Sequence, residues 1–379
     1  MPDSWAAVAT GCYDTTPTGH GRCVCWPTSP SIAAWASKRG WEWAPAGGPT
    51  LTVLYLTEQG SRLSRDGHCL VVSREGEVMA RVPAGLVEQV VVFGNISITT
   101  PALTYLLRHG VDCVFLSQDG HYFGRLVSGA SRFGLLRQAQ YRALSDEGLR
   151  LQVARGIVCG KLDNYLHYLA LWNADPADLT VLREMRTRAA ESLDVATLRG
   201  LEGLATAAYF AVLRSLVPRY LAFLRRNKRP PKDPVNSMLS LGYTLLAYVC
   251  WSAVEQVGLD VFGGFLHATV YSRPSLALDL IEELRTLVDD FVLQAVRQGE
   301  YGWPDFQVRD GGVFLSDEAR KRYLRAFQER VLERQIPHPS QHAPVAVRRA
   351  LELQARQVAD IVLGRERAYR AIALWASRR

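Results

Sequence analysis

The chain has 379 residues, of which 48% are hydrophobic and 21% are charged. This composition is typical of a globular protein with one large core or two modest ones, and it excludes disorder as a description of the whole chain. The formal net charge of +7 and the pI near 9.1 favour a polyanionic partner, although many unrelated proteins carry as much charge.

Cysteine usage and hydropathy bear on the compartment. Seven cysteines, an odd number at low density, favour reduced thiols in a cytosol. The first residues lack the charged start and apolar core of a signal peptide. Polar residues such as Ser240, Thr244 and Glu255 interrupt the apolar stretch 236–257, which therefore predicts a buried core helix. We expect a cytoplasmic protein without a membrane segment.

Residues 1–48 form a separate leader that is rich in Trp, Pro, Gly, Ser and Thr. Neither a helical nor a strand period is sustained in it, so its order is not predicted. Cys12, His20, Cys23 and Cys25 lie there, but their spacing favours ordinary free thiols over a metal site.

Residues 49–127 carry short runs rich in β-branched residues, including LTVLYLT, CLVVS, QVVVFG and DCVFLS. Gly-containing turns such as Asp66-Gly67 separate these runs. The pattern predicts a small β domain built of hairpins.

One short helix is expected to interrupt this sheet, in the segment TTPALTYLLRHG. Thr99 or Thr100 is placed to cap it, Pro101 lies in its first turn, and Gly110 follows its last turn. These are the residues that helix ends favour.

After a joint at residues 128–131 the hydrophobic period becomes helical and stays so. Helices are predicted over residues 137–172, 177–226, 236–257, 275–299 and 316–335, and from about residue 344. Residues 132–379 are thus expected to form a larger all-α catalytic domain, which gives an α+β fold class. The sequence contains no P-loop, dinucleotide fingerprint, HExxH or GxSxG motif.

Glu202 is the first candidate for chemistry. In LRGLEGLATAAYF it falls inside an apolar helical arc, four residues after Leu198 and three before Ala205. A carboxylate facing the packed side of a helix needs a partner, and the small residues around it leave space for a cation and a phosphate. The competing interpretation is a glutamate at the edge of the buried arc.

His267 and an acidic helix supply further candidates. His267 follows a short apolar run, and a lone histidine in such a place is more often a hydrogen-bonded core residue than a ligand. In SLALDLIEELRTLVDDF, Asp279 and Glu282 are three residues apart and share a helical face. Taken alone, that face is also typical of a solvated surface.

The combination of these groups suggests a metal site. Two helix carboxylates and one imidazole offer mixed oxygen and nitrogen ligation, which suits Mg²⁺ or Mn²⁺ with positions left for water and phosphate. Phosphodiester chemistry needs those open positions, and it requires no protein nucleophile.

A basic segment, YLAFLRRNKRPPKDPVNSML, lies between the proposed ligands in the sequence. Its prolines prevent helix continuation, and its clustered cations could clamp a phosphate backbone or simply form a solvated loop. The predicted DNA contacts are Arg225, Arg226, Lys228, Arg229 and Lys232, together with Arg273 and Arg285 beside the acidic helix.

Four blocks in this order resemble the CRISPR-associated adaptation integrases, the "Cas one" family. They are LRGLEGLATAAYF, KRPPKDPVNSMLSLGYTLL, GFLH followed by RPSLALDLIEELR, and GGVFLSDEARKRYLRAF. The resemblance extends from about Leu51 to the C-terminus and implies a small β domain followed by a helical catalytic domain. It also implies that Glu202, His267 and Glu282 bind the catalytic metal, with Asp279 as an adjacent acidic residue of the catalytic set.

The resemblance further implies a DNA integrase and endonuclease. Homodimers would assemble with a smaller CRISPR adaptation protein into a 4:2 heterohexamer, carry a prespacer duplex and insert it into the repeat array by 3′-hydroxyl attack. Two alternatives stay open on the sequence: a structure-selective, metal-dependent nuclease on branched DNA that uses water instead, and a non-catalytic DNA-binding assembly subunit.

Overall fold

The computed structural model describes residues 52–118, 120, 122–126, 133–228, 230–267 and 270–375. The chain divides into two units, residues 1–48 and 49–379, and every described residue lies in the second. The predictions for the leader, including free thiols at Cys12, Cys23 and Cys25, fall outside the described residues.

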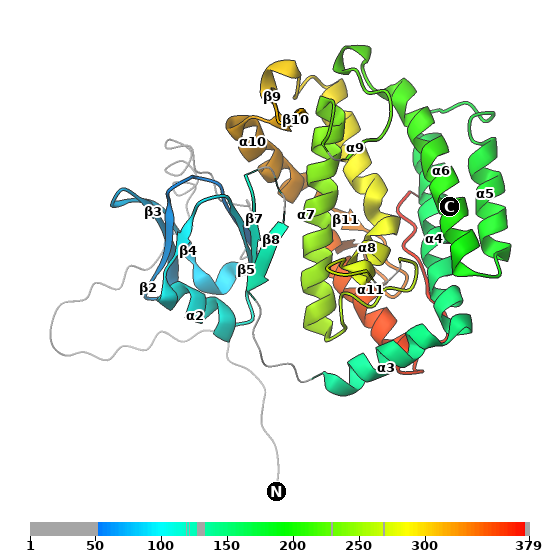
Figure 1. Cartoon of the computed structure of the whole chain (residues 1–379), viewed down its shortest axis with the longest axis horizontal. Helices are drawn as coiled ribbons and strands as arrows, with labels where there is room; N and C mark the ends of the chain where they lie inside the picture. The colour runs from blue at the N-terminus through cyan, green and yellow to red at the C-terminus, as the bar shows by residue number, and fades with distance from the viewer. Residues whose placement is uncertain are drawn as a thin grey trace, which may run out of the picture. The chain divides into compact units, whose positions relative to one another are not determined.

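The second unit begins with a β-rich region (Figure 1). Its described strands are β1 (Thr52–Leu56), β2 (Arg62–Asp66), β3 (Cys69–Arg74), β4 (Glu77–Pro83), β5 (Val87–Phe93), β6 (Ser97–Ile98), β7 (Asp112–Leu116) and β8 (Tyr122–Leu126). They form two four-stranded sheets with the orders β1-β5-β7-β8 and β4-β3-β2-β6. A short 3₁₀ turn, η1 (Ala84–Leu86), leads into β5.

The predicted hairpins are present in both sheets, but parallel strand pairs lie beside them. Strands β2, β3 and β4 pair antiparallel as expected, and so do β7 and β8. The pairs β1–β5 and β5–β7 are parallel, so the hairpin prediction was wrong for those two pairs. The physical reason lies in the continuous apolar run of β5, where Val90, Val91, Val92 and Phe93 are all buried. Strands buried on both faces are typical of parallel pairing.

The predicted short helix provides the crossover to β7. Helix α2 (Thr100–Arg108) begins after the N-cap Thr99, has Pro in its first turn, and packs against β2 and β7. Gly110, at φ +66°, then turns the chain into β7. This conformation is easily adopted by glycine.

The remainder of the unit is mostly helical, and its first helix begins at Gly134. Its described helices are α3 (Gly134–Ser145), α4 (Glu147–Leu171), α5 (Thr180–Glu191), α6 (Val195–Leu216), α7 (Pro234–Val257), α8 (Ser275–Ile281), α9 (Arg285–Arg297), α10 (Asp317–Phe327) and α11 (Val347–Val362). Short turns η2 (Arg219–Leu221), η3 (Glu282–Leu284), η4 (Trp303–Asp305) and η5 (Gln328–Leu332) connect some of them. The predicted α+β class is therefore confirmed, with two small hairpins added: β9 (Phe306–Arg309) with β10 (Gly312–Leu315), and β11 (Gln335–Ile336) with β12 (Val345–Ala346).

Two of the predicted long helices are each split by an aspartate. The Asp146 carboxylate accepts a hydrogen bond from the Leu149 amide at 3.0 Å and starts α4. Asp194 accepts from the Thr197 amide at 2.7 Å and starts α6. Capping satisfies amides that have no partner inside the helix, so each aspartate begins a new helix. Asp146 is also the C-cap of α3, whereas α5 ends at Glu191 with Ser192 as its C-cap.

Helix α7 lies in the interior of the helical region. Among the described helices it is the one whose length and composition would suit a membrane, yet 78% of its most apolar stretch is buried inside the protein. The expectation of a buried core helix is confirmed. Its Ser252 hydroxyl also accepts a hydrogen bond from Gln89 of β5, which ties α7 to the first sheet.

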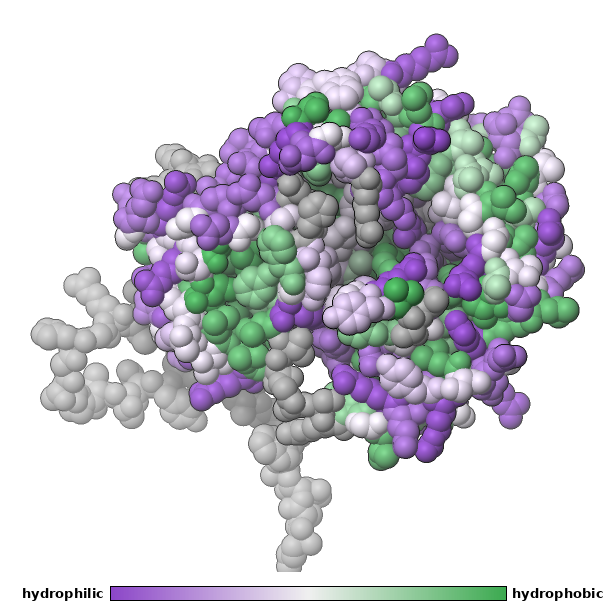
Figure 2. Space-filling model, in the orientation of Figure 1, coloured by the Kyte–Doolittle hydropathy of each residue, from purple (hydrophilic) through white to green (hydrophobic). Residues whose placement is uncertain are grey.

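Apolar side chains also reach the surface. Figure 2 shows them among hydrophilic ones, both over the β-rich region and over α5 and α6. Leu193 and Leu204, at the start and middle of the α6 segment, are 87% and 59% exposed.

Candidate metal centre

Three elements far apart in the sequence bring two carboxylates to one ammonium group. Lys161 lies on α4, Glu202 on α6 and Glu282 at the start of η3. The Lys161 Nζ donates to Glu202 Oε1, and it donates to Glu282 Oε2 at 2.6 Å. The Lys161 side chain is 1% exposed, whereas Glu202 is 21% and Glu282 is 4% exposed. The ammonium therefore approaches the carboxylates from the protein interior.

The charges of this cluster support each other. Burial alone would lower the pKa of Lys161, but the negative charge of Glu282, with contributions from Tyr165 and Glu202, raises it above its usual value. Burial would likewise raise the pKa of Glu282, but Arg285, Lys161 and His267 lower it to about 2. Both Lys161 and Glu282 are thus charged at neutral pH.

Arg285 completes the pairing of Glu282. Its Nε lies 3.0 Å from Glu282 Oε2, and its guanidinium lies over the Tyr243 ring at 4.7 Å from the centroid. Glu202 has a further donor in the Thr206 hydroxyl, at 2.8 Å from Oε1. Each of the two carboxylates is therefore held by at least two groups.

Asp279 holds the segment that carries His267. Its Oδ2 accepts from the amides of Phe265 and Leu266 at 2.6 and 2.9 Å, and its Oδ1 accepts from the His267 amide at 2.9 Å. The same Oδ1 lies 2.6 Å from His267 Nδ1. Asp279 is fully buried, so in this structure it orients the histidine and its backbone.

Gly264 is needed for this arrangement. A Cβ atom at this position would lie 2.8 Å from the Ser275 carbonyl carbon and 2.9 Å from Asp279 Oδ2. Only glycine lets the chain before His267 pass so close to the start of α8. The two glycines that the sequence shows before the histidine thus include one with a clear steric role.

An aromatic layer lies below the cluster. Tyr165 and Tyr209 stack with their ring centroids 3.7 Å apart. The hydroxyls of Tyr209 and Tyr243 both donate to Asp289, the former at 2.8 Å. Burial raises the pKa of Asp289 to about 6 in spite of these hydrogen bonds. This packed layer fixes α4, α6, α7 and α9 around the cluster.

The chemistry of the donor set fits a divalent cation. Two carboxylates and an imidazole are suitable ligands for Mg²⁺ or Mn²⁺. An imidazole whose Nδ1 is engaged by a carboxylate can present Nε2 to a metal, which is a common arrangement around metal-binding histidines. However, the described residues contain no group of three or more acidic, histidine or cysteine side chains already set at metal-binding spacing. Lys161 lies between the two carboxylates instead.

The predicted DNA contacts separate into two kinds. Arg226 points inward and donates to Asn236 Oδ1 at 2.8 Å and to the Ser240 hydroxyl at 3.0 Å, and Lys232 donates to the Gly311 carbonyl at 2.7 Å. These bonds fasten the basic loop to α7 and to the β9–β10 hairpin, which favours a structural role for both residues.

The other predicted DNA contacts differ in how much of each side chain is exposed to solvent. Arg225 and Lys228 are exposed, and Arg273 is half-buried. The pKa of Lys228 is lowered to about 8, first by the loss of water around its ammonium and next by the positive charges of Arg285 and Arg226. Lys228 therefore lies near the cluster, while Arg229 falls outside the described residues.

Sequence reasoning missed Lys161. In GIVCGKLDNYL it lies four residues after Ile157 and four before Tyr165, both of which are buried. A lysine on the buried face of a helix requires an acidic partner, so this spacing was a usable signal.

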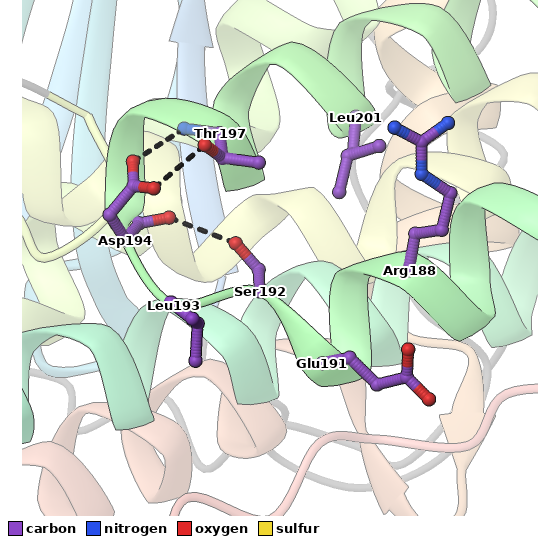
Figure 3. A pocket seen from close by; sticks show the side chains of 7 residues that line it. All are labelled: Arg188, Glu191, Ser192, Leu193, Asp194, Thr197 and Leu201. Atoms are coloured by element: carbon purple, nitrogen blue, oxygen red, sulfur yellow. Dashed lines mark hydrogen bonds between the residues drawn. The ribbon is translucent and has the colours of Figure 1, made fainter.

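A surface pocket of about 340 Å³ lies elsewhere on α6, at its junction with α5. Figure 3 shows that its Asp194 carboxylate is engaged by Thr197 at the helix start. Neither the Glu202 nor the Glu282 carboxylate lines this pocket. One of its two acidic side chains, Asp194, is thus used for capping, the other is Glu191, and the pocket is separate from the cluster.

Comparisons with known proteins agree on one family. A sequence model of the CRISPR associated protein Cas1 family matches residues 54–329. A protein of Thermus thermophilus named CRISPR-associated endonuclease Cas1 3 is 38% identical over 84% of this chain and 96% of its own length.

Solved structures share the fold. A CAS1 protein from Thermotoga maritima covers 84% of this chain and 98% of its own, with a TM-score of 0.74 and 24% identity. A casposase bound to integration product covers 84% of this chain and 92% of its own, with a TM-score of 0.75 and 23% identity.

Proposed function

Because the chain belongs to the Cas1 family of CRISPR-associated endonucleases, we propose that it is a metal-dependent DNA integrase of CRISPR adaptation. It would insert prespacer DNA into the repeat array by attack of a 3′-hydroxyl on a phosphodiester. The observation that supports this proposal most is the convergence of Glu202 and Glu282, from two separate helical segments, on one buried point beside the His267 segment.

Glu202, His267 and Glu282 would hold the Mg²⁺ or Mn²⁺ ion. When bound, such an ion polarises a phosphoryl oxygen and stabilises charge on the leaving oxygen. The residues of the chain prepare for this chemistry without contributing a nucleophile. Asp279 keeps His267 in one orientation through the ring contact at 2.6 Å and the backbone bonds described above.

Cations around the cluster suit a negatively charged substrate. Arg285 and Lys161 pair with the carboxylates. Lys228 interacts electrostatically with both Arg285 and Glu282, and its side chain is exposed to solvent. Lys228 would contact the DNA backbone near the scissile phosphate, and the exposed Arg225 would extend that contact along the strand.

The proposed assembly follows from the contents of solved structures with the same fold. One solved structure of the same fold is a complex that contains Cas1 and Cas2, and another is a casposase bound to its integration product. By analogy, homodimers of this chain would assemble with the smaller adaptation protein into a 4:2 complex on double-stranded prespacer and repeat DNA. This complex would act in the cytoplasm, where the described thiols of Cys69, Cys113, Cys159 and Cys250 stay reduced.

The attacking group is what distinguishes an integrase from a nuclease on branched DNA. The test is an integration assay with the purified protein, its partner protein, the cognate array and Mg²⁺ or Mn²⁺. A prespacer with 3′-hydroxyl ends should join to the array, while a 3′-dideoxy prespacer should not. Metal-dependent cleavage that is equally strong with both prespacers, without joining, would instead support the nuclease, whose water nucleophile needs no 3′-hydroxyl.

Matched glutamate variants test the site itself. Glu202→Gln should abolish joining and leave prespacer binding intact in mobility-shift assays run without divalent metal. Glu300→Gln, which removes a surface carboxylate paired with Arg330, should join at the wild-type rate. Equal activity of the Glu202 variant and the wild type would reject the proposed ligand.

A further inference from the structure

The Lys161 ammonium occupies a place that it cannot easily leave. Its side chain is almost completely buried, and its Nζ lies 5.4 Å from the centroid of the Tyr165 ring. The neighbouring Gly160 is covered by the C-terminal segment, since a Cβ there would come within 2.2 Å of the Ala371 side chain. A swing of Lys161 toward solvent would require it to pass the carboxylates that it binds.

The two carboxylates are already neutralised without any metal ion. Lys161 bonds to both Glu202 and Glu282, and Arg285 pairs with Glu282. The positive charges of Lys161 and Arg285 therefore balance the negative charges of the two glutamates. Lys228 adds a third cation, whose charge also interacts with that of Glu282.

A divalent ion would enter this balanced site against like charges. Electrostatic repulsion between a buried ammonium and an ion held by the same carboxylates is strong, because little water screens it. A phosphodiester that arrives with the ion brings negative charge and relieves that repulsion. By linkage, the ion must then strengthen DNA binding by the same factor as DNA strengthens ion binding.

We infer that Lys161 is an internal counter-cation that keeps divalent metal binding weak in free protein, so that the site fills only together with DNA. The inference rests on the proposed function, because it takes Glu202 and Glu282 as ligands. Lys161 is thus a positioning residue that acts through the two carboxylates. The protein would remain folded and preassembled without metal, and its nuclease chemistry would be restricted to the DNA-bound state.

The test is a titration of the full-length protein with Mn²⁺, with and without a prespacer duplex. Electron paramagnetic resonance measures the concentration of free Mn²⁺ at each step and so gives the Mn²⁺ affinity. Wild-type protein should bind Mn²⁺ at least about tenfold more tightly when DNA is present. Lys161→Met should bind Mn²⁺ about tenfold more tightly than wild type without DNA, and should gain less from DNA. Lys321→Met is the matched control, because it removes an ammonium that pairs with Glu58 and Glu318 instead.

Thermal stability gives a second readout in case Lys161→Met folds poorly. Lys161→Met should lower the Tm of metal-free protein, and Mn²⁺ should then raise its Tm by more than it raises that of wild type. Should Lys161→Met not fold at all, Lys228→Met at the exposed cation should tighten Mn²⁺ binding in the same direction to a smaller extent.

The outcomes separate the inference from its premise. If Lys161→Met binds Mn²⁺ no more tightly than wild type, the counter-cation role is overturned, but the ligand set is not. If Lys161→Met does not fold, the same result in Lys228→Met overturns the counter-cation role. Mn²⁺ binding that survives in the double variant Glu202→Gln/Glu282→Gln would reject the ligand set itself, and the inference with it.

Discussion

Replacement of Asp279 by asparagine tests whether this carboxylate holds the His267 segment or binds metal itself. The two Asp279 oxygens together receive four close contacts, from the Phe265, Leu266 and His267 amides and from the His267 ring. An asparagine offers one oxygen and one NH2 group. Whichever way the amide turns, its NH2 group faces at least one backbone N–H that has lost its acceptor.

The magnitude follows from this count. One or two hydrogen bonds to a charged acceptor are lost, each worth about 1.5–3 kcal/mol, so Asp279→Asn should lose roughly 2–6 kcal/mol of unfolding free energy. Asp66→Asn is a suitable control, because Asp66 and its partner Arg81 are 62% and 53% exposed, so the loss of this pair should cost about 1 kcal/mol or less.

Two measurements on the same preparation decide between the roles. Denaturant unfolding should show the loss of stability in Asp279→Asn, and the integration assay should show a parallel loss of joining because His267 is no longer oriented. Wild-type stability combined with abolished joining would refute this reasoning, since that result would mean that Asp279 acts as a ligand rather than as a support for the histidine.

Three further predictions follow from the structure. Glu282→Gln should abolish joining and metal-induced stabilisation in thermal scans, while prespacer binding measured without divalent metal persists. Arg225→Ala should reduce the slope of log affinity against log salt by about one, whereas Arg226→Ala should lower the Tm because it breaks the bonds that fasten the loop. Burial raises the pKa of Glu283 from 4.5 to about 7, so its contribution to stability is fully present below about pH 4.5 and is lost as the pH rises through 7; Glu283→Gln should flatten that decline in Tm between pH 4.5 and 7.

Much of the fold could be predicted because local patterns and tertiary packing agree. Period and capping residues gave α2 and the core helix α7 at nearly the observed positions. The predictions of single helices over residues 137–172 and 177–226 were wrong, because new helices begin at the capping residues Asp146 and Asp194. Hydrophobic periodicity alone continues through a capping aspartate. Pairing direction in the first sheet depends on which strands meet in space, and a run such as that of β5 fits several partners.

The candidate site was predictable in its acidic groups and not in its cations. Glu202 could be recognised because a carboxylate inside an apolar arc needs a partner, but the partner proved to be Lys161 from another helix. Composition of the basic loop could not distinguish the exposed Arg225 from the inward-pointing Arg226. Only the packing of that loop against α7 decides which side chains remain available to DNA.

The most direct test of the metal centre is anomalous diffraction from crystals grown with Mn²⁺ and a prespacer duplex, recorded at the manganese absorption edge. We expect one anomalous peak per active site, bonded to the carboxylates of Glu202 and Glu282 and to the His267 imidazole. Peaks located away from these three side chains, with the site otherwise ordered and bound to DNA, would contradict the account.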